Sequence, residues 1–323
     1  MKPRSLMMYG ASGSTKTSQC FHLVKYLHGT KASPGPMFGK KWRLIHSDGG
    51  GYAPFVDSGL VQAGVVEIFD FSSWPYSLSG WRWLQRGYWP RDLGKGMQFS
   101  SSPEFMTTPE EWNGIAGYIH EGIASEGETL KTHVSNQKEK VGFKNSYVYE
   151  ENGEEFRGLD EGHYGLIQKE IFSGHMKGFN TLPIPWLVYT SLVGMGKDKQ
   201  RNVGGVDTTY VYGPQIVGNA ATPSAPQWFM DCLHLSKEKF KKHNPDHTLG
   251  EEMEGMVAWF TQHNDSVTGM PYLCKCRLLP ELYPELLRYF PYGFVPLGFN
   301  HGIDNYFRVL DSLMKKAGVS EWL

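Results

Sequence analysis

Small residues, hydroxyl side chains and one lysine gather in a short segment near the amino end of the chain. Small residues let backbone N–H groups point at phosphate oxygens, and the amino terminus of a following helix attracts negative charge. Lys16 is placed to reach the β and γ phosphates of a nucleotide, and the Thr17 hydroxyl to bind Mg²⁺. The segment predicts a phosphate loop made of Gly10, Ala11, Ser12, Gly13, Ser14, Thr15, Lys16, Thr17 and Ser18.

The neighbours of this segment favour the phosphate loop over a simple turn followed by a surface lysine. Residues 5–9 are an apolar run that predicts a buried strand, and residues 18–28 carry apolar side chains at helical spacing. The match to G-x-x-x-x-G-K-[ST] is imperfect, because Thr15 stands at the second glycine. This change is harmless if the φ angle of Thr15 is negative.

Two acidic residues follow predicted strands and would complete a nucleotide site. Open α/β sheets bind ligands at the carboxyl ends of their strands, where Asp48 and Glu121 are expected. One acid would hold Mg²⁺ and the other would orient the attacking water. The simpler interpretations are a turn former for Asp48 and a solvated loop acid for Glu121. His46 and His120 precede these acids, and we expect them to pack or support the site rather than bind metal.

Alternating strand and helix patterns along the chain must position these residues. They predict an α/β fold with a mostly parallel central sheet and helices on both faces. The expected strands are residues 5–9, 42–46, 65–71, 115–120 and 186–192, with later strands at 228–235 and 270–278. The expected helices are residues 18–28, 164–179 and 303–316.

Two stretches carry weaker patterns. Residues 72–109 are rich in Trp, Ser, Gly and Pro and are expected to form a long loop or insertion with little regular structure. Residues 125–162 are polar, and Asn152-Gly153 favours a hairpin over residues 146–156. We expect one core over residues 1–282 and a helical extension over residues 283–323.

Composition excludes several classes of protein. The 32 basic and 33 acidic residues give a net charge of −1, which argues against a globally basic nucleic-acid binder. The 45 aromatic residues (18 Phe, 17 Tyr and 10 Trp) argue against a disordered chain. No apolar run approaches the roughly 18 residues of a membrane helix, so we expect a cytoplasmic protein. The cysteines are too few for a disulfide framework and are expected to be reduced: Cys20, Cys232, Cys274 and Cys276.

With these residues placed, the chain resembles the phage-encoded RecA-like P-loop ATPases, the AAA-type group that includes phage single-strand annealing proteins. The segments that carry the resemblance are YGASGSTKTS at residues 9–18, LIHSDGGG at 44–51, YIHEGIAS at 118–125 and VYGPQIVGNAATPSAPQWFMDCLHL at 211–235. The strand PYLCKCRLLPEL at 271–282 also fits. The resemblance implies a RecA-like P-loop NTPase fold with late antiparallel strands, and an ATPase that uses ATP and Mg²⁺.

The resemblance also implies roles for individual residues. Lys16 and Thr17 would bind the phosphates and Mg²⁺. Glu121 takes the Walker B position as the second Mg²⁺ ligand, and Asp48 takes the place of the catalytic carboxylate, usually Glu. Because Asp48 is one methylene shorter and Thr15 replaces glycine, turnover is expected to be slow.

Three further features of the family would lie around the nucleotide. Thr190 or Ser191, at the end of the strand 186–192, would be the sensor that reads the γ-phosphate. Lys275 and Arg277 would reach a nucleotide on a neighbouring subunit of a ring or filament. Their alternative interpretation is a solvated strand face.

The substrate of the ATPase is less clearly marked. The resemblance implies single-stranded DNA, in recombination, annealing or replication, bound by an oligomer. Candidate contacts are the basic runs 197–201 and 237–242 and the insertion residues Trp81, Trp83, Arg86, Trp89 and Arg91. These aromatic residues would otherwise pack the insertion against the core. The alternatives to this function are a DNA-packaging or assembly motor, a nucleotide-binding structural module with negligible turnover, and a small-molecule kinase.

Overall fold

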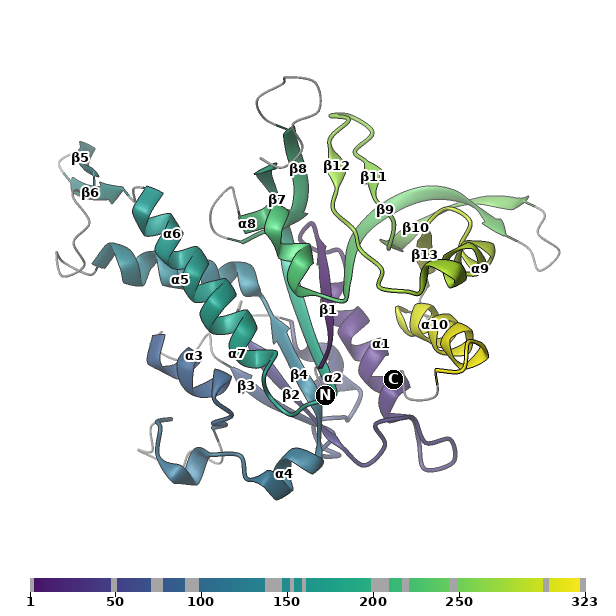
Figure 1. Cartoon of the computed structure of the whole chain (residues 1–323), viewed down its shortest axis with the longest axis horizontal. Coiled ribbons are helices and arrows are strands. Elements are labelled where there is room, and N and C mark those ends of the chain that lie inside the picture. Colours follow the sequence, from purple (N-terminus) through teal and green to yellow (C-terminus); the bar gives the residue numbers. More distant parts are fainter. Residues whose placement is uncertain are drawn as a thin grey trace.

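The computed structural model describes residues 3–47, 51–70, 78–90, 99–136, 147–151, 154–158, 161–198, 209–216, 221–243, 249–298 and 302–319. Within these residues an 11-stranded sheet runs through the molecule (Figure 1). The chain is therefore an α/β protein, as its alternating pattern predicts.

The centre of the sheet consists of parallel strands in the order β3, β2, β4, β7, β1, β9. Every residue of β1 and β4 is buried, which is typical of parallel strands covered on both faces. Gly10 at the end of β1 lies opposite Leu192 of β7 and Leu235 of β9. The bounds of these strands are β1 Arg4–Gly10, β2 Lys41–His46, β3 Val66–Asp70, β4 Ile115–Glu121, β7 Trp186–Asp198 and β9 Asp231–His243.

Antiparallel strands extend the sheet on one side, as the resemblance implied. β10 (Leu249–Trp259) pairs with β9, and β13 (Phe294–Leu297) pairs with β10. β8 (Thr209–Pro214) pairs antiparallel with the second half of β7 and carries the short strands β12 (Pro271–Tyr272) and β11 (His263–Asn264). The sheet is thus mixed but mostly parallel at its centre.

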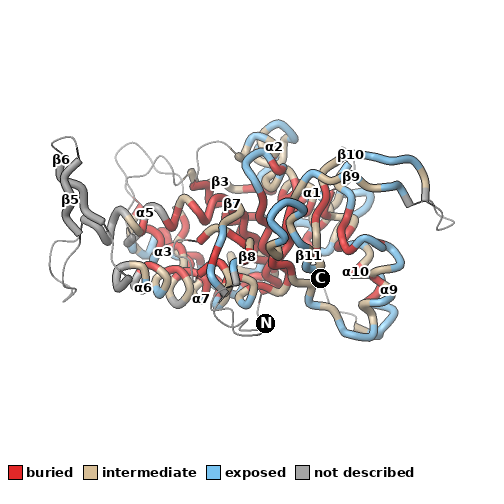
Figure 2. Tube along the Cα trace, turned by 90° about the horizontal axis from the view of Figure 1, so that it is seen from above, coloured by how far each residue is buried: buried red, intermediate tan, exposed pale blue. Residues whose placement is uncertain are grey.

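Helices cover both faces of the sheet, and alternate side chains of β1 point to opposite layers. Leu6 and Met8 belong to one buried cluster, and Met7 and Tyr9 to the other. Figure 2 shows the buried strands with α1 and α2 on one side and α3, α6 and α7 on the other. The first layer contains α1 Lys16–His28, α2 Ala53–Asp57, α9 Tyr283–Tyr289 and α10 Asp304–Lys316. The second contains α3 Leu78–Gln85, α5 Ile123–Asn136, α6 Glu161–Lys169, the π-helix η3 Glu170–Met176, α7 Lys177–Phe179 and α8 Ala221–Ser224.

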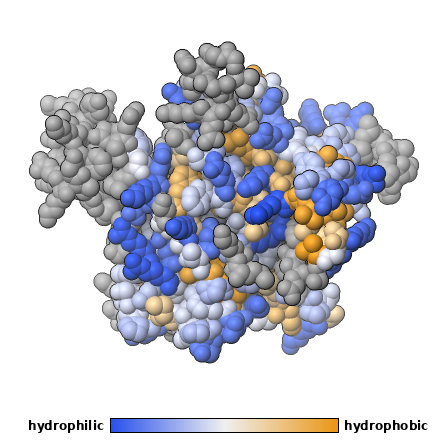
Figure 3. Space-filling model, in the orientation of Figure 1, coloured by the Kyte–Doolittle hydropathy of each residue, from blue (hydrophilic) through white to orange (hydrophobic). Residues whose placement is uncertain are grey.

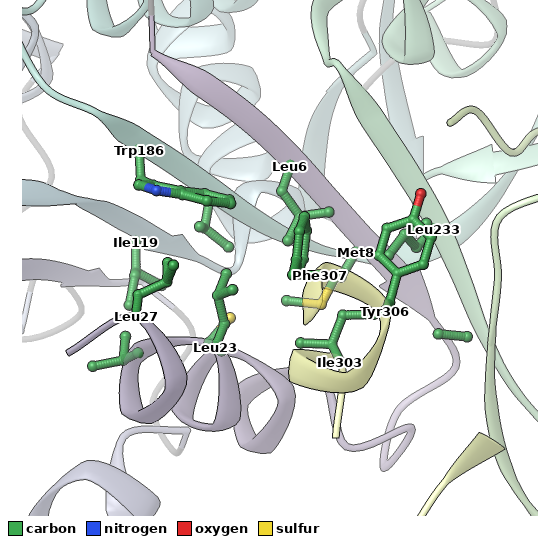
Figure 4. Close-up of a cluster of buried hydrophobic side chains, with 14 of the residues drawn as sticks. Leu6, Met8, Leu23, Leu27, Ile119, Trp186, Leu233, Ile303, Tyr306 and Phe307 are labelled. Carbon is green, nitrogen blue, oxygen red and sulfur yellow. The ribbon is translucent and has the colours of Figure 1, made fainter. Parts of the chain in front are cut away.

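The carboxyl-terminal segment packs against the amino-terminal helix and the sheet. Tyr306 and Phe307 of α10 are fully buried and lie close to Leu6, Met8 and Leu23 (Figure 4). The segment 283–323, expected as a helical extension, therefore contributes α9, β13 and α10 to the same core that holds β1.

The insertion at residues 72–109 is more structured than its composition predicts. Its described part contains α3 and the 3-10 turn η2 (Pro103–Phe105), and it is followed by α4 (Pro109–Asn113). Trp81 and Trp89 are buried in the core, so these two side chains are not available to stack on bases, and that part of the DNA hypothesis is wrong. Helix α3 was not expected from the composition, because its segment of 8 residues is too short for a clear helical alternation of polar and apolar residues.

The polar stretch 125–162 also contains a helix that sequence reasoning missed. α5 begins at Ile123 and ends at Asn136, and it buries Ile123 and Leu130 against the sheet. The expected hairpin forms from β5 (Tyr147–Glu151) and β6 (Glu154–Gly158), which pair antiparallel. Its turn residues lie outside the described part of the chain.

The remaining expectations are largely met by the described residues. The helix expected at 164–179 is present but includes the π-helical segment. The strand expected at 270–278 is limited to β12 and an isolated bridge between Lys275 and Cys232. The four cysteines are free thiols.

The helices and the surface bear on the expectation that the chain has no membrane-spanning helix. No helix in the described part of the chain is long and apolar enough to cross a bilayer. The face in Figure 3 is mainly hydrophilic, with hydrophobic patches near its centre and towards the carboxyl-terminal elements.

Candidate functional site

The segment after β1 forms a tight loop that leads directly into α1. Gly10 is needed at its start, because a Cβ there would fall against the Leu235 carbonyl and lie 2.6 Å from Ser14 Oγ. Gly13 adopts a positive φ of 77°, which favours glycine. The Ser14 N–H donates to the Ala11 carbonyl (3.1 Å), which closes the turn. The loop therefore places the amino terminus of a 13-residue helix beside the end of a buried strand.

Thr15 immediately precedes α1 and has a left-handed backbone. Its φ is +61° and its ψ is +17°. Among the described residues it is the one non-glycine with positive φ. The condition under which threonine would be harmless at this position, a negative φ, is therefore not met. A β-branched residue in this region is strained by roughly 1–2 kcal/mol, so the loop keeps its shape at a cost that glycine would avoid.

Lys16 lies over the loop that precedes it. Its amine donates to the Gly10 carbonyl (3.2 Å), the Ala11 carbonyl (2.9 Å) and Ser14 Oγ (3.2 Å). The positive charge is thus held beside the loop N–H groups and the positive end of α1. This combination favours a phosphate group.

The Thr17 side chain joins the phosphate loop to β4. Its hydroxyl donates to Glu121 Oε1 at 2.7 Å, across 104 positions of sequence. The other carboxylate oxygen, Oε2, lies 3.0 Å from His46 Nε2. Glu121 is buried, its Oε1 accepts the Thr17 hydrogen bond, and the His46 ring lies beside its Oε2. A hydroxyl and a carboxylate at one point are hard oxygen ligands of the kind that Mg²⁺ prefers.

The end of β4 is fixed by its two neighbouring strands. Ser47, after β2, donates its hydroxyl hydrogen to the Glu121 carbonyl at 2.7 Å. The Gly122 N–H donates to Thr190 Oγ1 of β7 at 3.1 Å. Ser191 Oγ is bonded to the Gln215 carbonyl at 2.9 Å. The acid at the end of β4 therefore lies near the two hydroxyls expected as sensors, which occupy the middle of β7 rather than its end.

These groups line one pocket of about 470 Å³. Its wall is formed by the phosphate loop, the start of α2 with the residue Gly51 before it, the turn between β4 and α5, and the middle of β7. The pocket is lined by Ser12, Gly13, Ser14, Thr15, Lys16, Thr17, Ser18, Gly51, Pro54, Glu121, Gly122, Ala124, Ser125, Thr190, Ser191 and Leu192. Most of the expected site residues are thus brought together, and Gly10 and Ala11 shape the loop beneath them.

Lys275 and Arg277 do not line this pocket in the structure. A third expected residue, Asp48, lies outside the described residues. Lys275 is engaged within its own chain, because its amine donates to the Phe229 carbonyl (2.7 Å) and the Pro226 carbonyl (3.2 Å). These bonds disfavour the expected reach of Lys275 to a neighbouring subunit. Arg277 is exposed, and its backbone N–H donates to Asp231 at the amino end of β9.

Gly51 approaches the acid closely. Its N–H donates to His46 Nε2 at 2.9 Å, and a Cβ added there would lie 2.6 Å from the Glu121 carboxyl carbon. A side chain at residue 51 would therefore move the carboxylate. Sequence reasoning placed this glycine in a turn but gave no sign of its contact with Glu121.

For the nucleotide hydrolysis that the sequence predicts, replacing Gly51 with alanine is expected to lower the rate by about tenfold or more, because misplacing a reacting group by about 1 Å can cost up to about 100-fold. Steady-state hydrolysis at several Mg²⁺ concentrations measures the effect. Gly165→Ala is the matched control, since a Cβ at this α6 position meets nothing within 4 Å. Equal activity of the two variants would show that the Glu121 position does not matter.

A second cluster, which sequence reasoning missed, lies behind β4. His120, Glu126 and His175 are each almost fully buried, and one ligand atom from each lies within 4.8 Å of the others. Burial and the neighbouring His175 lower the pKa of His120 well below its usual value. No local motif marks this cluster, because its members come from a strand and two helices that are distant in sequence.

Comparisons with known proteins add no assignment. No protein-family model matches the chain. A search of curated proteins finds no significant match. The function must therefore be argued from the geometry of the pocket.

Proposed function

We propose that the protein binds a nucleoside triphosphate with Mg²⁺ in this pocket and hydrolyses it, with ATP as the expected nucleotide. The observation that carries the proposal is the 2.7 Å hydrogen bond from Thr17 to Glu121 at the mouth of the phosphate loop. It brings a hydroxyl next to Lys16 and a buried carboxylate from another strand to one point, which is the ligand set of a Mg²⁺–phosphate site.

The proposal includes a RecA-like arrangement of the site, which the strand order supports. β7, which carries Thr190 and Ser191, lies between β1 and β4. Sensor hydroxyls in that strand would face a γ-phosphate held between the loop and Glu121. The resemblance of the sequence segments gives the same assignment independently of the strand order.

Different residues of the pocket would have different roles in phosphoryl transfer. The loop N–H groups and Lys16 bind and orient the phosphates, and Lys16 neutralises charge that develops on them. Thr17 and Glu121 would hold Mg²⁺, which supplies further charge neutralisation when bound. Thr190, which accepts a hydrogen bond from the Gly122 N–H, would sense the γ-phosphate. Asp48 remains our proposal for the water-orienting carboxylate.

The proposal includes an oligomer in which Arg277 reaches the nucleotide of a neighbouring subunit. An exposed arginine supplied in this way can raise the rate by about 10³–10⁵-fold. Arg277 meets the requirement of exposure, whereas Lys275 does not, because its amine is bonded within the chain.

Single-stranded DNA is the proposed polymer partner, and it would contact short basic segments rather than a globally basic surface. Lys197, near the end of β7, is exposed and belongs to the basic run expected to bind DNA. The run 237–242 is a weaker candidate, because Lys237 pairs with Glu254 (2.8 Å) and Lys241 lies opposite Glu252 on β10. This compensation lowers the positive charge available to phosphates.

The test is ATP hydrolysis by the full-length protein with and without single-stranded DNA. We expect Mg²⁺-dependent hydrolysis that DNA accelerates, at low salt most strongly. Hydrolysis that is indifferent to DNA would overturn the DNA part alone. Hydrolysis only in the presence of procapsids would indicate a packaging motor. Tight ATP binding without turnover would indicate a structural module. Transfer of a phosphoryl group to a metabolite would indicate a kinase.

A further inference from the structure

The cluster behind β4 joins three elements of the fold. His120 is the residue before Glu121 in β4, Glu126 lies in the first turn of α5, and His175 lies in the π-helix η3. His175 Nδ1 lies 2.6 Å from Glu126 Oε1, and His120 Nδ1 lies 3.9 Å from Glu126 Oε2. A π-helix widens a helical turn and often occurs at functional sites, and here it carries one of the three side chains.

Several polar atoms of the cluster are buried without a hydrogen bond among the described residues. They are both ring nitrogens of His120, Glu126 Oε2 and His175 Nε2. An unsatisfied buried polar group costs about 1–3 kcal/mol, and more when it is charged. Buried polar atoms that lack a hydrogen bond within the described part of the chain occur on all three side chains, which favours one shared electron-pair acceptor, such as a metal ion.

We propose that His120, Glu126 and His175 form a binding site for one divalent transition-metal ion, of the zinc type. Two imidazoles and a carboxylate are a ligand set that such ions favour, with a fourth position left for another ligand. Metal–ligand bonds of about 2.0–2.2 Å place ligand atoms roughly 3–4 Å apart, so small side-chain rotations bring this cluster to the required geometry.

Aromatic rings surround the cluster, and none of its three residues lines the phosphate pocket. His120 stacks on Trp81 (4.9 Å between centroids) and on Tyr189 (5.0 Å), and Phe179 contacts both histidines. Enclosure of this kind strengthens metal–ligand electrostatics by excluding water. A bound ion would tie α5 and η3 to the strand that ends in Glu121. The site stands independently of the proposed nucleotide function.

The test is titration of Zn²⁺ and Co²⁺ into metal-free full-length protein. We expect one tight site per chain, visible Co²⁺ absorption, and a melting temperature that a chelator lowers by several degrees. Glu126→Gln, which keeps the size of the side chain, is expected to weaken binding by more than the roughly 10–100-fold that loss of a supporting residue costs. His175→Gln is expected to act in the same way.

Two control variants locate the ion. His263→Gln removes a histidine from the other close pair of imidazoles, where His234 Nδ1 lies 3.1 Å from His263 Nε2. Glu121→Gln alters the phosphate pocket. Both are expected to keep the Co²⁺ spectrum. Wild-type protein that binds neither ion would overturn the site, even if Glu126→Gln fails to fold, and loss of the spectrum in either control would place the ion elsewhere.

Discussion

Lys16→Ala is expected to weaken nucleotide binding by at least about 100-fold and to reduce hydrolysis to background. The Lys16 amine is the charge that lies over the phosphate loop, within 3.2 Å of the Gly10 carbonyl and of Ser14 Oγ. A charged hydrogen bond is worth about 1.5–3 kcal/mol, and each 1.4 kcal/mol is a tenfold change in affinity. Binding of a fluorescent ATP analogue and release of phosphate are the measurements.

Lys25→Ala is the matched control, because Lys25 is an exposed lysine in the last turn of the same helix. It should bind and hydrolyse ATP as the wild type does. If Lys16→Ala kept full affinity, the loop would be an ordinary turn and its lysine a surface residue.

Glu121→Gln is expected to leave ATP bound while hydrolysis falls by about 10²–10³-fold, the usual effect of removing one group that stabilises the transition state. The amide keeps the size of the carboxylate and can still accept the Thr17 hydrogen bond of 2.7 Å. It removes the negative charge that would hold Mg²⁺. The dependence of the rate on Mg²⁺ should therefore shift to higher concentration.

Glu110→Gln serves as the comparison for that variant, since Glu110 is an exposed acid in the first turn of α4. Its rate and Mg²⁺ dependence should match the wild type. A Glu121→Gln protein with unchanged turnover would contradict the assignment of Glu121 to the metal.

The sequence predicted the parts of the site that local pattern determines. A strand, a run of small residues and a helix are contiguous, so the phosphate loop could be located from residues 5–28 alone. Glu121 was found because it follows an apolar run, and the carboxyl ends of parallel strands meet at one edge of a sheet. Thr190 and Ser191, which were expected only from the resemblance, also line the pocket.

Features that depend on distant contacts could not be found in this way. The left-handed backbone of Thr15 is set by the loop as a whole, and a threonine gives no sign of it. Lys275 looked available from its alternation with Arg277, but the Phe229 carbonyl that binds it lies 46 positions away. The partners His120 and His175 are separated by the helices α5 and α6 and the β5–β6 hairpin, so no spacing rule joins them.

Burial also overrode composition in the insertion. Aromatic and arginine side chains at residues 81–91 have the composition of a base-stacking surface. Trp81 instead packs on His120, and Arg82 pairs with Glu170 of η3 at 3.0 Å. Residue types alone cannot distinguish a stacking surface from a core, because both require large flat side chains.

Calorimetric titration of ATP into the protein, with and without Mg²⁺, tests whether the pocket binds a nucleoside triphosphate with Mg²⁺. We expect one saturable site per chain, competition by ADP, weaker binding without Mg²⁺, and loss of the signal in Lys16→Ala. The absence of saturable binding, or equal binding by wild type and Lys16→Ala, would contradict it.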